Sequence, residues 1–190
     1  MKKKNKWLNP FHWLSHKGWF FYDLPYFIYE NQWTKGVELG AKSGRSMFYM
    51  LKHNKELHLS GIDKWQVIEG GAYKRNPLNE LRCKRRLKRF QERADLIHED
   101  ALVAAGFFED DSLDFVHYDL QCKPMLGKHG EMIAKWTVKI KDGGVLIGRD
   151  FRDFRDSFYR LGYEENEIFK CKIKGRFSRR LEYLVVKKSY

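Results

Sequence analysis

Cysteine is scarce in this sequence, and its spacing excludes two common uses. The three cysteines, Cys83, Cys122 and Cys171, are odd in number and include no CxxC pair. This pattern argues against a disulfide scaffold and against a zinc knuckle, and it is typical of a reducing compartment. The seven histidines show no metal-ligand spacing either.

Long apolar runs are also missing, so we expect no transmembrane helix. The first residues are basic, like the start of a signal peptide, but polar residues follow where an apolar segment would have to stand. We therefore expect a cytoplasmic protein that does not insert into a membrane. A length of 190 residues suits one domain with a proper hydrophobic core.

Acidic residues are outnumbered, and the net charge is +12. A basic protein of this kind is suited to an acidic partner such as nucleic acid, a phosphorylated sugar or an anionic surface. The same charge could equally serve only to keep the protein in solution. Charge alone leaves both interpretations open.

The N-terminal part differs in composition from the rest of the chain. Residues 7–33 are rich in aromatic side chains and are interrupted by Pro10 and Pro25, which predicts short helices and turns. We interpret residues 1–34 as a basic, aromatic cap segment and residues 35–190 as the main domain. The segment could cover an acceptor pocket, stack on bases, or simply pack against the sheet.

Strand-like and helix-like segments alternate over the remaining residues. The expected strands cover residues 35–39, 57–62, 95–98, 113–118 and 145–148, followed by a hairpin of residues 165–172 and 180–187 around Gly175. The expected helices cover residues 46–53, 76–93, 101–105, 125–140 and 151–161. This alternation predicts an α/β fold whose parallel sheet is covered on both faces. Ligands of such sheets bind beyond the carboxyl ends of the strands.

A glycine-rich loop follows the first expected strand. Gly40 and Gly44 stand between a strand and a helix, where glycine allows a tight turn and close approach to a ligand. The next helix offers free N–H groups to a carboxylate or phosphate. The loop lacks the Gly-Lys-Ser/Thr ending of a Walker loop and also the G-x-G-x-x-G spacing of a dinucleotide-binding loop. Asp63 follows the second strand about 20 residues later, as a ribose-binding acid requires.

Five segments in order resemble the class I S-adenosylmethionine-dependent methyltransferases, nearest the branch of small-molecule and sugar O-methyltransferases and cephalosporin-hydroxylase-like proteins. These segments are residues 38–46, similar to E-x-G-x-x-x-G-x-S, and residues 61–65, 98–101, 112–119 and 138–151. The resemblance implies a Rossmann-like three-layer sandwich with a seven-stranded, mostly parallel sheet and an antiparallel C-terminal hairpin strand. It also implies S-adenosyl-L-methionine as the cofactor and a methyl acceptor reacting through oxygen or nitrogen.

The resemblance also assigns cofactor contacts. The implied residues are Glu38, Gly40, Ala41, Lys42, Ser43, Gly44, Ser46, Asp63, Lys64, Trp65, Asp100, Ala101 and Asp119. Glu38 would steady the loop or contact the cofactor's amino group. Asp63 would hold the ribose, and Asp100 would accept from the adenine amino group. Trp65 would either flank the adenine or belong to the core.

Methyl transfer needs little from the protein beyond in-line alignment and removal of the acceptor's proton, because the sulfonium is already activated. Asp119, at the end of the fourth strand, is the expected base; the alternative is that it only positions the methionine end. His117 is the second candidate base, with a structural histidine as the default interpretation.

The sequence departs from the family where many members bind a divalent metal. Asp119 is followed by Leu120, Gln121 and Cys122 instead of a second acid and a histidine, and Arg149 precedes Asp150. We expect no obligatory metal, with Mg²⁺ shared by Asp119 and Asp150 as the alternative. The same loss leaves open a catalytically inactive domain that binds nucleic acid or a glycan.

Cations gather where the acceptor is expected. The predicted hairpin turn lies at the carboxyl-end rim, so we expect Arg149, Asp150, Lys174 and Arg176 to bind the acceptor. A small molecule, a sugar or a nucleic acid with negative charge would suit them. The helix at residues 76–93 adds a row of cations that forms either a solvated face or a nucleic-acid contact. This row comprises Arg82, Lys84, Arg85, Arg86, Lys88, Arg89 and Arg93.

Overall fold

The computed structural model describes residues 24–65, 77–120, 129–149, 151–172 and 181–186, and the account below concerns these residues. Their strands are β1 (Lys35–Leu39), β2 (His58–Asp63), β3 (Ala94–His98), β4 (Leu113–Tyr118), β5 (Ile140–Arg149), β6 (Ile168–Lys172) and β7 (Leu181–Val186). Their helices are α1 (Leu24–Glu30), α2 (Arg45–His53), α3 (Asn79–Leu87), α4 (Ala101–Ala104), α5 (His129–Thr137) and α6 (Phe151–Arg160). Short 3₁₀ turns are η4 (Lys88–Phe90), η5 (Ala105–Phe107) and η7 (Glu165–Glu167).

The strands form one sheet in the order β3-β2-β1-β4-β5-β7-β6. The first five of these are parallel neighbours, which confirms the predicted α/β fold with a parallel sheet. β7 runs antiparallel to β5, and β6 runs antiparallel to β7, so β6 points the same way as β5. The switch point lies between β1 and β4, where successive crossovers go to opposite sides of β1.

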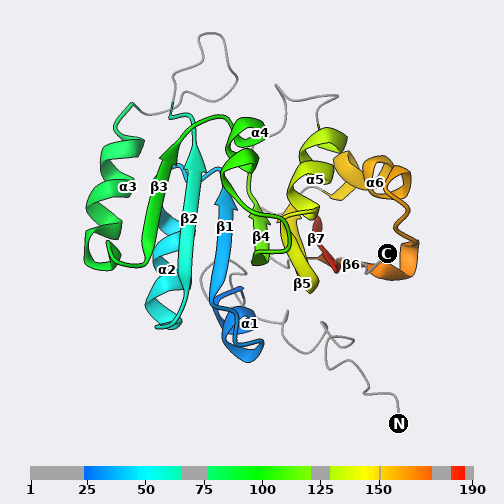
Figure 1. The fold of residues 1–190 in the computed structure, drawn as a ribbon, viewed down its shortest axis with the longest axis horizontal. Helices are drawn as coiled ribbons and strands as arrows, with labels where there is room; N and C mark the ends of the chain where they lie inside the picture. Colours follow the sequence, from blue (N-terminus) through cyan, green and yellow to red (C-terminus); the bar gives the residue numbers. More distant parts are fainter. Residues whose placement is uncertain (1–23, 66–76, 121–128, 150, 173–180, 187–190) are drawn as a thin grey trace.

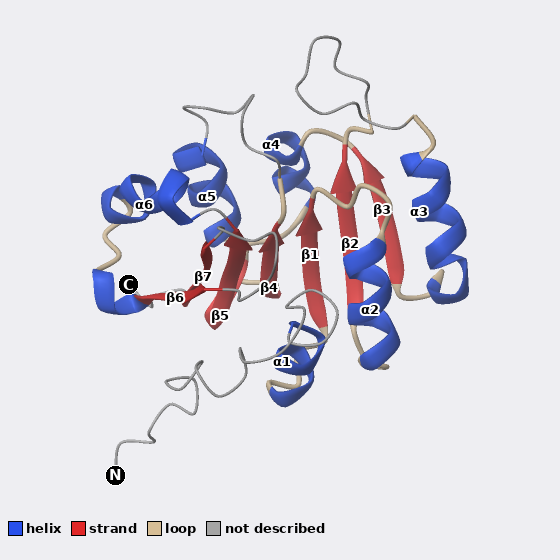
Figure 2. Cartoon of the chain, turned by 180° about the vertical axis from the view of Figure 1, so that it is seen from behind, coloured by secondary structure: helices blue, strands red, loops and turns tan. Residues whose placement is uncertain are grey.

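The two faces of the sheet bury separate apolar clusters, as the alternation of side chains along each strand requires. On one face, Val37 and Leu39 pack with Trp136 of α5 and Phe158 of α6. On the other face, α1, α2 and α3 are buried against the sheet. Figures 1 and 2 show these helices on the two sides of the strands.

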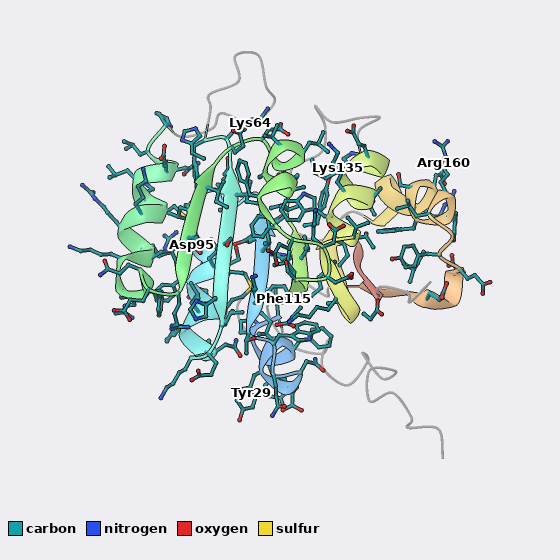
Figure 3. The ribbon with its side chains drawn as sticks, viewed as in Figure 1. Tyr29, Lys64, Asp95, Phe115, Lys135 and Arg160 are labelled. Atoms are coloured by element: carbon teal, nitrogen blue, oxygen red, sulfur yellow. The ribbon has the colours of Figure 1, made fainter. Side chains whose placement is uncertain are left out.

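Residues 24–33 pack at the amino-terminal edge of the sheet (Figure 2). Leu24 and Ile28 are fully buried, and the ring of Trp33 stacks on Phe115 with 5.4 Å between centroids. Figure 3 shows Phe115 near α1 and Lys64 at the opposite edge. These residues therefore belong to the core and lie away from the carboxyl ends of the strands. Residues 1–23 of the predicted cap segment lie outside the described residues.

Several predicted boundaries were wrong. The helix expected at residues 76–93 begins at Asn79 and ends at Leu87, and it is followed by η4 and, from Ala94, by β3. The helix expected to reach residue 140 ends at Thr137. Fully buried Ile140 already pairs with Leu113, so β5 starts before its glycines. The residues between Ile140 and Val145, which the expected strand at 145–148 leaves out, belong to β5 and form an irregularity where its register against β4 shifts.

No helix within the described part of the chain is both long enough and apolar enough to cross a bilayer.

Candidate functional site

The loop after β1 is held between the ends of two neighbouring strands. Its first residue, Gly40, donates its N–H to the carbonyl of Ile62 at 2.8 Å, and Asp119 donates its N–H to the carbonyl of Leu39 at 2.9 Å. Gly40 has a φ of +92°, and a Cβ there would lie 2.7 Å from the carbonyl oxygen of Asp119. Only glycine is compatible with this conformation and this contact.

The loop ends at Gly44, which precedes the first turn of α2. Gly44 has a φ of +67°, and a Cβ there would lie 2.7 Å from Sγ of Cys83. Burial raises the pKa of the Cys83 thiol to about 12, with the negative charge of Glu38 as the next cause. No side chain of the described residues caps the N terminus of α2. Its first N–H groups can therefore receive an anion such as a carboxylate.

Glu38 lies under this loop with its carboxylate fully buried. Its Oε1 accepts a hydrogen bond from Oγ of Ser46 and lies 3.2 Å from Nδ1 of His117. Its Oε2 is buried and has no hydrogen-bond partner among the residues that the structure describes. A buried carboxylate oxygen without a donor is unfavourable, so this atom marks a place for a ligand donor.

Asp63, at the end of β2, connects two loops. Its Oδ2 accepts from the N–H of Lys42 at 2.9 Å, and its Oδ1 accepts from the N–H of Trp65 at 2.8 Å. The indole N–H of Trp65 donates to the carbonyl of Lys42 at 2.6 Å, and its ring meets the edge of His98 with 5.5 Å between centroids. Asp63 and Trp65 thus hold the glycine-rich loop against the loop that follows β2.

Asp100 occupies the corresponding position after β3 and caps α4 by accepting from the N–H of Leu102 at 2.8 Å. Its other oxygen pairs with Nζ of Lys64 at 2.6 Å. Partial burial alone would raise the pKa of Asp100, but the Lys64 ammonium and the backbone donors outweigh it and lower the pKa. Asp100 is therefore ionised at neutral pH and joins the ends of β2 and β3. Ala101, next to it, is buried.

The two predicted catalytic candidates have different surroundings. Asp119 directly follows β4 beside Gly40 and is half-buried, so its carboxylate lies at the edge where the loop begins. His117 is fully buried and bonds Glu38. A general base must lie within hydrogen-bond reach of the proton that it removes, whereas one ring nitrogen of His117 is already engaged by Glu38. Its full burial and its contact with Glu38 favour the structural interpretation, and the role of His117 as a second base stays a prediction.

The strands and loops described above lie within the part of the chain that matches a known protein family. A family model described as a methyltransferase domain matches residues 37–151. The chain belongs to this methyltransferase family. None of the curated proteins matches the chain significantly in sequence.

Solved structures, some of them named as O-methyltransferases, share the fold of this methyltransferase. Cofactor-bound Rv0187 from MTB superposes with a TM-score of 0.67 at 13% identity, over 87% of this chain and 78% of that one. A candidate caffeoyl-CoA O-methyltransferase from Staphylococcus aureus gives 0.60 at 14% identity, over 86% and 80%. An O-methyltransferase family protein from Burkholderia thailandensis gives 0.61 at 13% identity, over 87% and 55%. At these identities the likeness shows the fold.

The predicted acceptor residues of the methyltransferase are only partly within the described structure. Arg149 ends β5, whereas Asp150, Lys174 and Arg176 lie outside the described residues. Arg149 pairs in register with Glu182, and Lys172 pairs with Leu181, so both ends of the connection between β6 and β7 lie at the carboxyl edge. Within the described ranges, no group of three or more His, Cys, Asp or Glu side chains could hold a metal ion.

Arg86 is a functional candidate that the sequence analysis missed. The sequence groups it with the cations of a solvated or nucleic-acid-binding helix face, but its guanidinium donates to the carbonyl of Ser43 and lies 3.1 Å from Oγ of Ser43. Arg86 stands three residues after buried Cys83 and therefore lies beside the apolar stripe of α3. This spacing is the sequence signal that distinguishes it from the exposed cations of the same helix. Arg86 thus attaches α3 to the glycine-rich loop.

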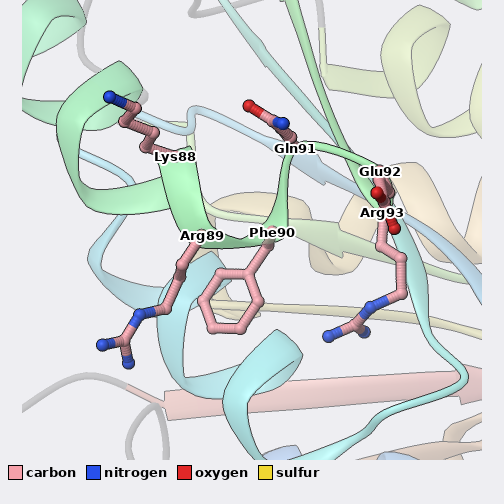
Figure 4. A pocket seen from close by; sticks show the side chains of 6 residues that line it. All are labelled: Lys88, Arg89, Phe90, Gln91, Glu92 and Arg93. Carbon is pink, nitrogen blue, oxygen red and sulfur yellow. The ribbon is translucent and has the colours of Figure 1, made fainter.

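Two other cations of this row are also used within the methyltransferase. Arg93 donates to the carbonyls of Asn54 and Leu57, both at 2.9 Å, and so closes the end of α2. The guanidinium of Arg89 lies over the rings of Phe48 and Phe90. Residues 88–93 line a pocket of about 310 Å³ just before β3 (Figure 4). This pocket therefore lies at the amino-terminal edge, opposite the glycine-rich loop.

A second missed pair connects β4 to α5. Oη of Tyr118 lies 3.1 Å from Nδ1 of His129, and both side chains are buried. Tyr118 immediately precedes Asp119, and His129 is the first residue of α5. The pair fixes the end of β4 against the helix on the other side of the sheet from Glu38.

Proposed function

We propose that this methyltransferase takes S-adenosyl-L-methionine as its methyl donor and methylates an oxygen, or alternatively a nitrogen, of a polar acceptor. The observation that carries this proposal is the buried Oε2 of Glu38, which has no donor in the described part of the chain and lies below the uncapped start of α2. An ammonium group of a ligand can donate to Oε2 of Glu38, and a carboxylate can accept from the free N–H groups at the start of α2. One amino-acid moiety carries both groups, as the methionine part of the cofactor does.

The remaining strand ends suit the nucleoside part. Each carboxylate oxygen of Asp63 accepts one backbone N–H and keeps a further lone pair, so the side chain can also accept ribose hydroxyls. Trp65 lies between the loop and His98, where its ring can border a purine. Asp100, held ionised by Lys64, can accept from an amino group. Lys42, Ser43 and Ala41 would contribute through the backbone of the loop.

Bound S-adenosylmethionine supplies an activated methyl group on its sulfonium. Asp119 is the residue that we assign to receive the acceptor's proton, because it stands at the strand end next to the loop and is half-buried. Fixing both reactants at this edge provides the alignment on which the rate depends. If Asp119 instead positions the methionine end of the cofactor, its removal should lower the affinity for the cofactor and not the rate of transfer.

The acceptor's charge is inferred from the rim. Arg149 and the flanks of the β6–β7 connection stand at the carboxyl edge, and this connection carries Lys174 and Arg176 in the sequence. Together with the net charge of +12, they favour an anionic acceptor, either a small molecule or sugar or a nucleic acid. The O-methyltransferase names of the structural neighbours support oxygen over nitrogen. We propose that no metal is required, since Arg149 can supply the positive charge beside Asp150.

Calorimetric titration with S-adenosylmethionine tests the donor. We expect one site per chain with micromolar affinity, and absence of binding at about 1 mM would refute the proposal. Turnover on a panel of acceptors should persist in EDTA. Loss of turnover in EDTA that added Mg²⁺ restores would show that the enzyme requires the metal. Binding without transfer to any acceptor would favour the alternative, an inactive methyltransferase-like domain that binds nucleic acid or a glycan.

A further inference from the structure

The buried pair of Glu38 and His117 has a geometry that the proposed chemistry does not use directly. The two residues stand opposite each other in the register of β1 and β4, and both side chains have 0% exposure. Nδ1 of His117 lies 3.2 Å from Oε1 of Glu38. Ser46, in the first turn of α2, donates from Oγ to the same oxygen.

Both contacts fall on one oxygen of the carboxylate. An ionised carboxylate can only accept hydrogen bonds, so Nδ1 of His117 carries the proton in this contact. Two donors on Oε1, one from a strand and one from a helix, fix the rotation of the carboxylate group. Oε2 then has a set position and, among the described residues, no donor. Below the loop, the charge of Glu38 also helps to raise the pKa of Cys83, whose thiol lies against Gly44.

We infer that His117 is a positioning residue which holds Glu38 so that Oε2 receives the ammonium group of the ligand, and that this pair makes binding depend on the ligand's amino-acid moiety. The inference rests on the proposed function, because it concerns the same loop and the same donor. A hydrogen bond that orients a charged acceptor before binding removes the cost of ordering it afterwards. His117 acts through Glu38 and touches neither reactant.

Two ligands that differ only in the relevant part isolate this effect. S-adenosylhomocysteine carries the ammonium and carboxylate groups, whereas 5′-methylthioadenosine keeps the purine, ribose and sulfur without them. A purely structural histidine would alter the affinity for both ligands alike. A positioning histidine alters only the affinity for S-adenosylhomocysteine.

The experiment compares His117→Leu with His117→Asn in calorimetric titrations of both ligands. Leucine removes the donor, whereas the asparagine amide nitrogen can stand where Nδ1 stood. We expect the leucine variant to bind S-adenosylhomocysteine at least about tenfold more weakly, as for a hydrogen bond to a charged group, and 5′-methylthioadenosine within about twofold. The asparagine variant should recover most of the loss. Equal weakening of both ligands, or no weakening, overturns the inference.

Further variants keep the test decisive. His129→Asn removes a second buried histidine of the described residues, which pairs with Tyr118 on the opposite face, and should leave the ratio of the two affinities unchanged. If the leucine variant does not fold, Ser46→Ala removes the second donor to Oε1 and should lower the ratio in the same direction, about threefold. An unchanged ratio in Ser46→Ala would then contradict the inference.

The outcomes also separate this inference from the proposed function. If the unmodified protein binds neither ligand, the proposed donor is wrong, and the inference fails with it. If it prefers S-adenosylhomocysteine and the leucine variant keeps the full preference, the donor assignment stands and only the role of His117 is refuted.

Discussion

The two edges of the sheet are held together by different interactions. At the amino-terminal edge, Asp114 accepts from the N–H groups of Thr34 and Lys35 at 2.9 and 2.8 Å and pairs with Nζ of Lys141 at 2.8 Å. At the carboxyl edge, Asp63 and Asp100 hold loops, and Gly40 and Gly44 take positive φ values. At the first edge Asp114 has its partners within the chain, although the buried Oγ of Ser112 has none among the described residues. The second edge keeps a buried carboxylate oxygen and a helix N terminus open.

This difference teaches where sequence changes should affect binding and where they should affect stability. Strain and incomplete polar pairing persist in folded proteins mainly where function requires them. Changes at the carboxyl edge should therefore alter ligand affinity, and changes at the amino-terminal edge should alter unfolding alone.

The largest effect is expected for Gly40→Ala. The added Cβ would lie 2.7 Å from the carbonyl oxygen of Asp119, and alanine disfavours a φ of +92°. We expect loss of about 2 kcal/mol in the free energy of unfolding and binding of S-adenosylmethionine weaker by at least about 100-fold. Urea denaturation and calorimetry measure the two quantities.

Gly106→Ala is the matched control, since a Cβ there meets no atom of the described residues within 4 Å. It should leave affinity and stability close to those of the unmodified protein. Tight cofactor binding by Gly40→Ala would contradict the close approach assigned to the loop.

A split between affinity and rate is expected for the acids at the ends of β2 and β4. Asp63→Ala removes the acceptor that fixes Lys42 and Trp65, so the dissociation constant for the cofactor should rise about tenfold or more. Asp119→Ala should mainly slow the single-turnover transfer rate, by about 100-fold or more, at nearly unchanged affinity. Equal loss of cofactor affinity in both variants would refute the separate roles.

At the opposite edge, Asp114→Asn should reduce stability without changing cofactor affinity. Burial alone would raise the pKa of Asp114, but Lys141 and the two backbone donors outweigh it and lower the pKa. A lowered pKa in the folded state stabilises the fold above the unfolded-state pKa, and this contribution disappears as the pH falls through the folded-state pKa. The variant should thus be about 1 kcal/mol less stable at pH 7 and indistinguishable in strong acid.

Urea titrations across that pH range measure the difference between the two proteins. A gap that persists in strong acid would show that packing, and not the charge of Asp114, is responsible. A change in cofactor affinity would break the division between the two edges.

The smallest effect is expected on α3. Arg86→Ala removes the contacts to Ser43, so the cofactor should bind about threefold more weakly. The matched control is Arg85→Ala on the same helix, because exposed Arg85 forms no ion pair with any residue in the described ranges. Titration calorimetry compares the two variants, and identical affinities would remove Arg86 from the loop's support.

Much of the carboxyl edge could be predicted from the sequence, because strand ends are marked by local signals. β1 and β4 occupy the predicted residues, and Gly40, Gly44, Asp63 and Asp100 stand at strand ends as expected. These signals depend on backbone conformation and on an acid directly after an apolar run. Both can be recognised without knowing what lies across the sheet.

What could not be predicted depends on contacts between distant segments. The pairing of Glu38 with His117 arises from the register of β1 against β4, which sequence spacing does not specify. The sequence groups Arg86 with the other cations of a solvated or nucleic-acid-binding helix face, because its contact with Ser43 depends on how α3 packs beside a loop 43 residues away. Phe107 is 62% exposed while the adjacent Phe108 packs against the core, a difference that two identical neighbouring residues do not reveal in the sequence.

The most direct test of the central claim is calorimetric titration of S-adenosylmethionine into the unmodified protein and into Gly40→Ala. The account predicts one site of micromolar affinity in the unmodified protein and at least about a 100-fold loss in the variant. Absence of heat in the unmodified protein up to about 1 mM cofactor, or equal affinity in both proteins, would contradict it.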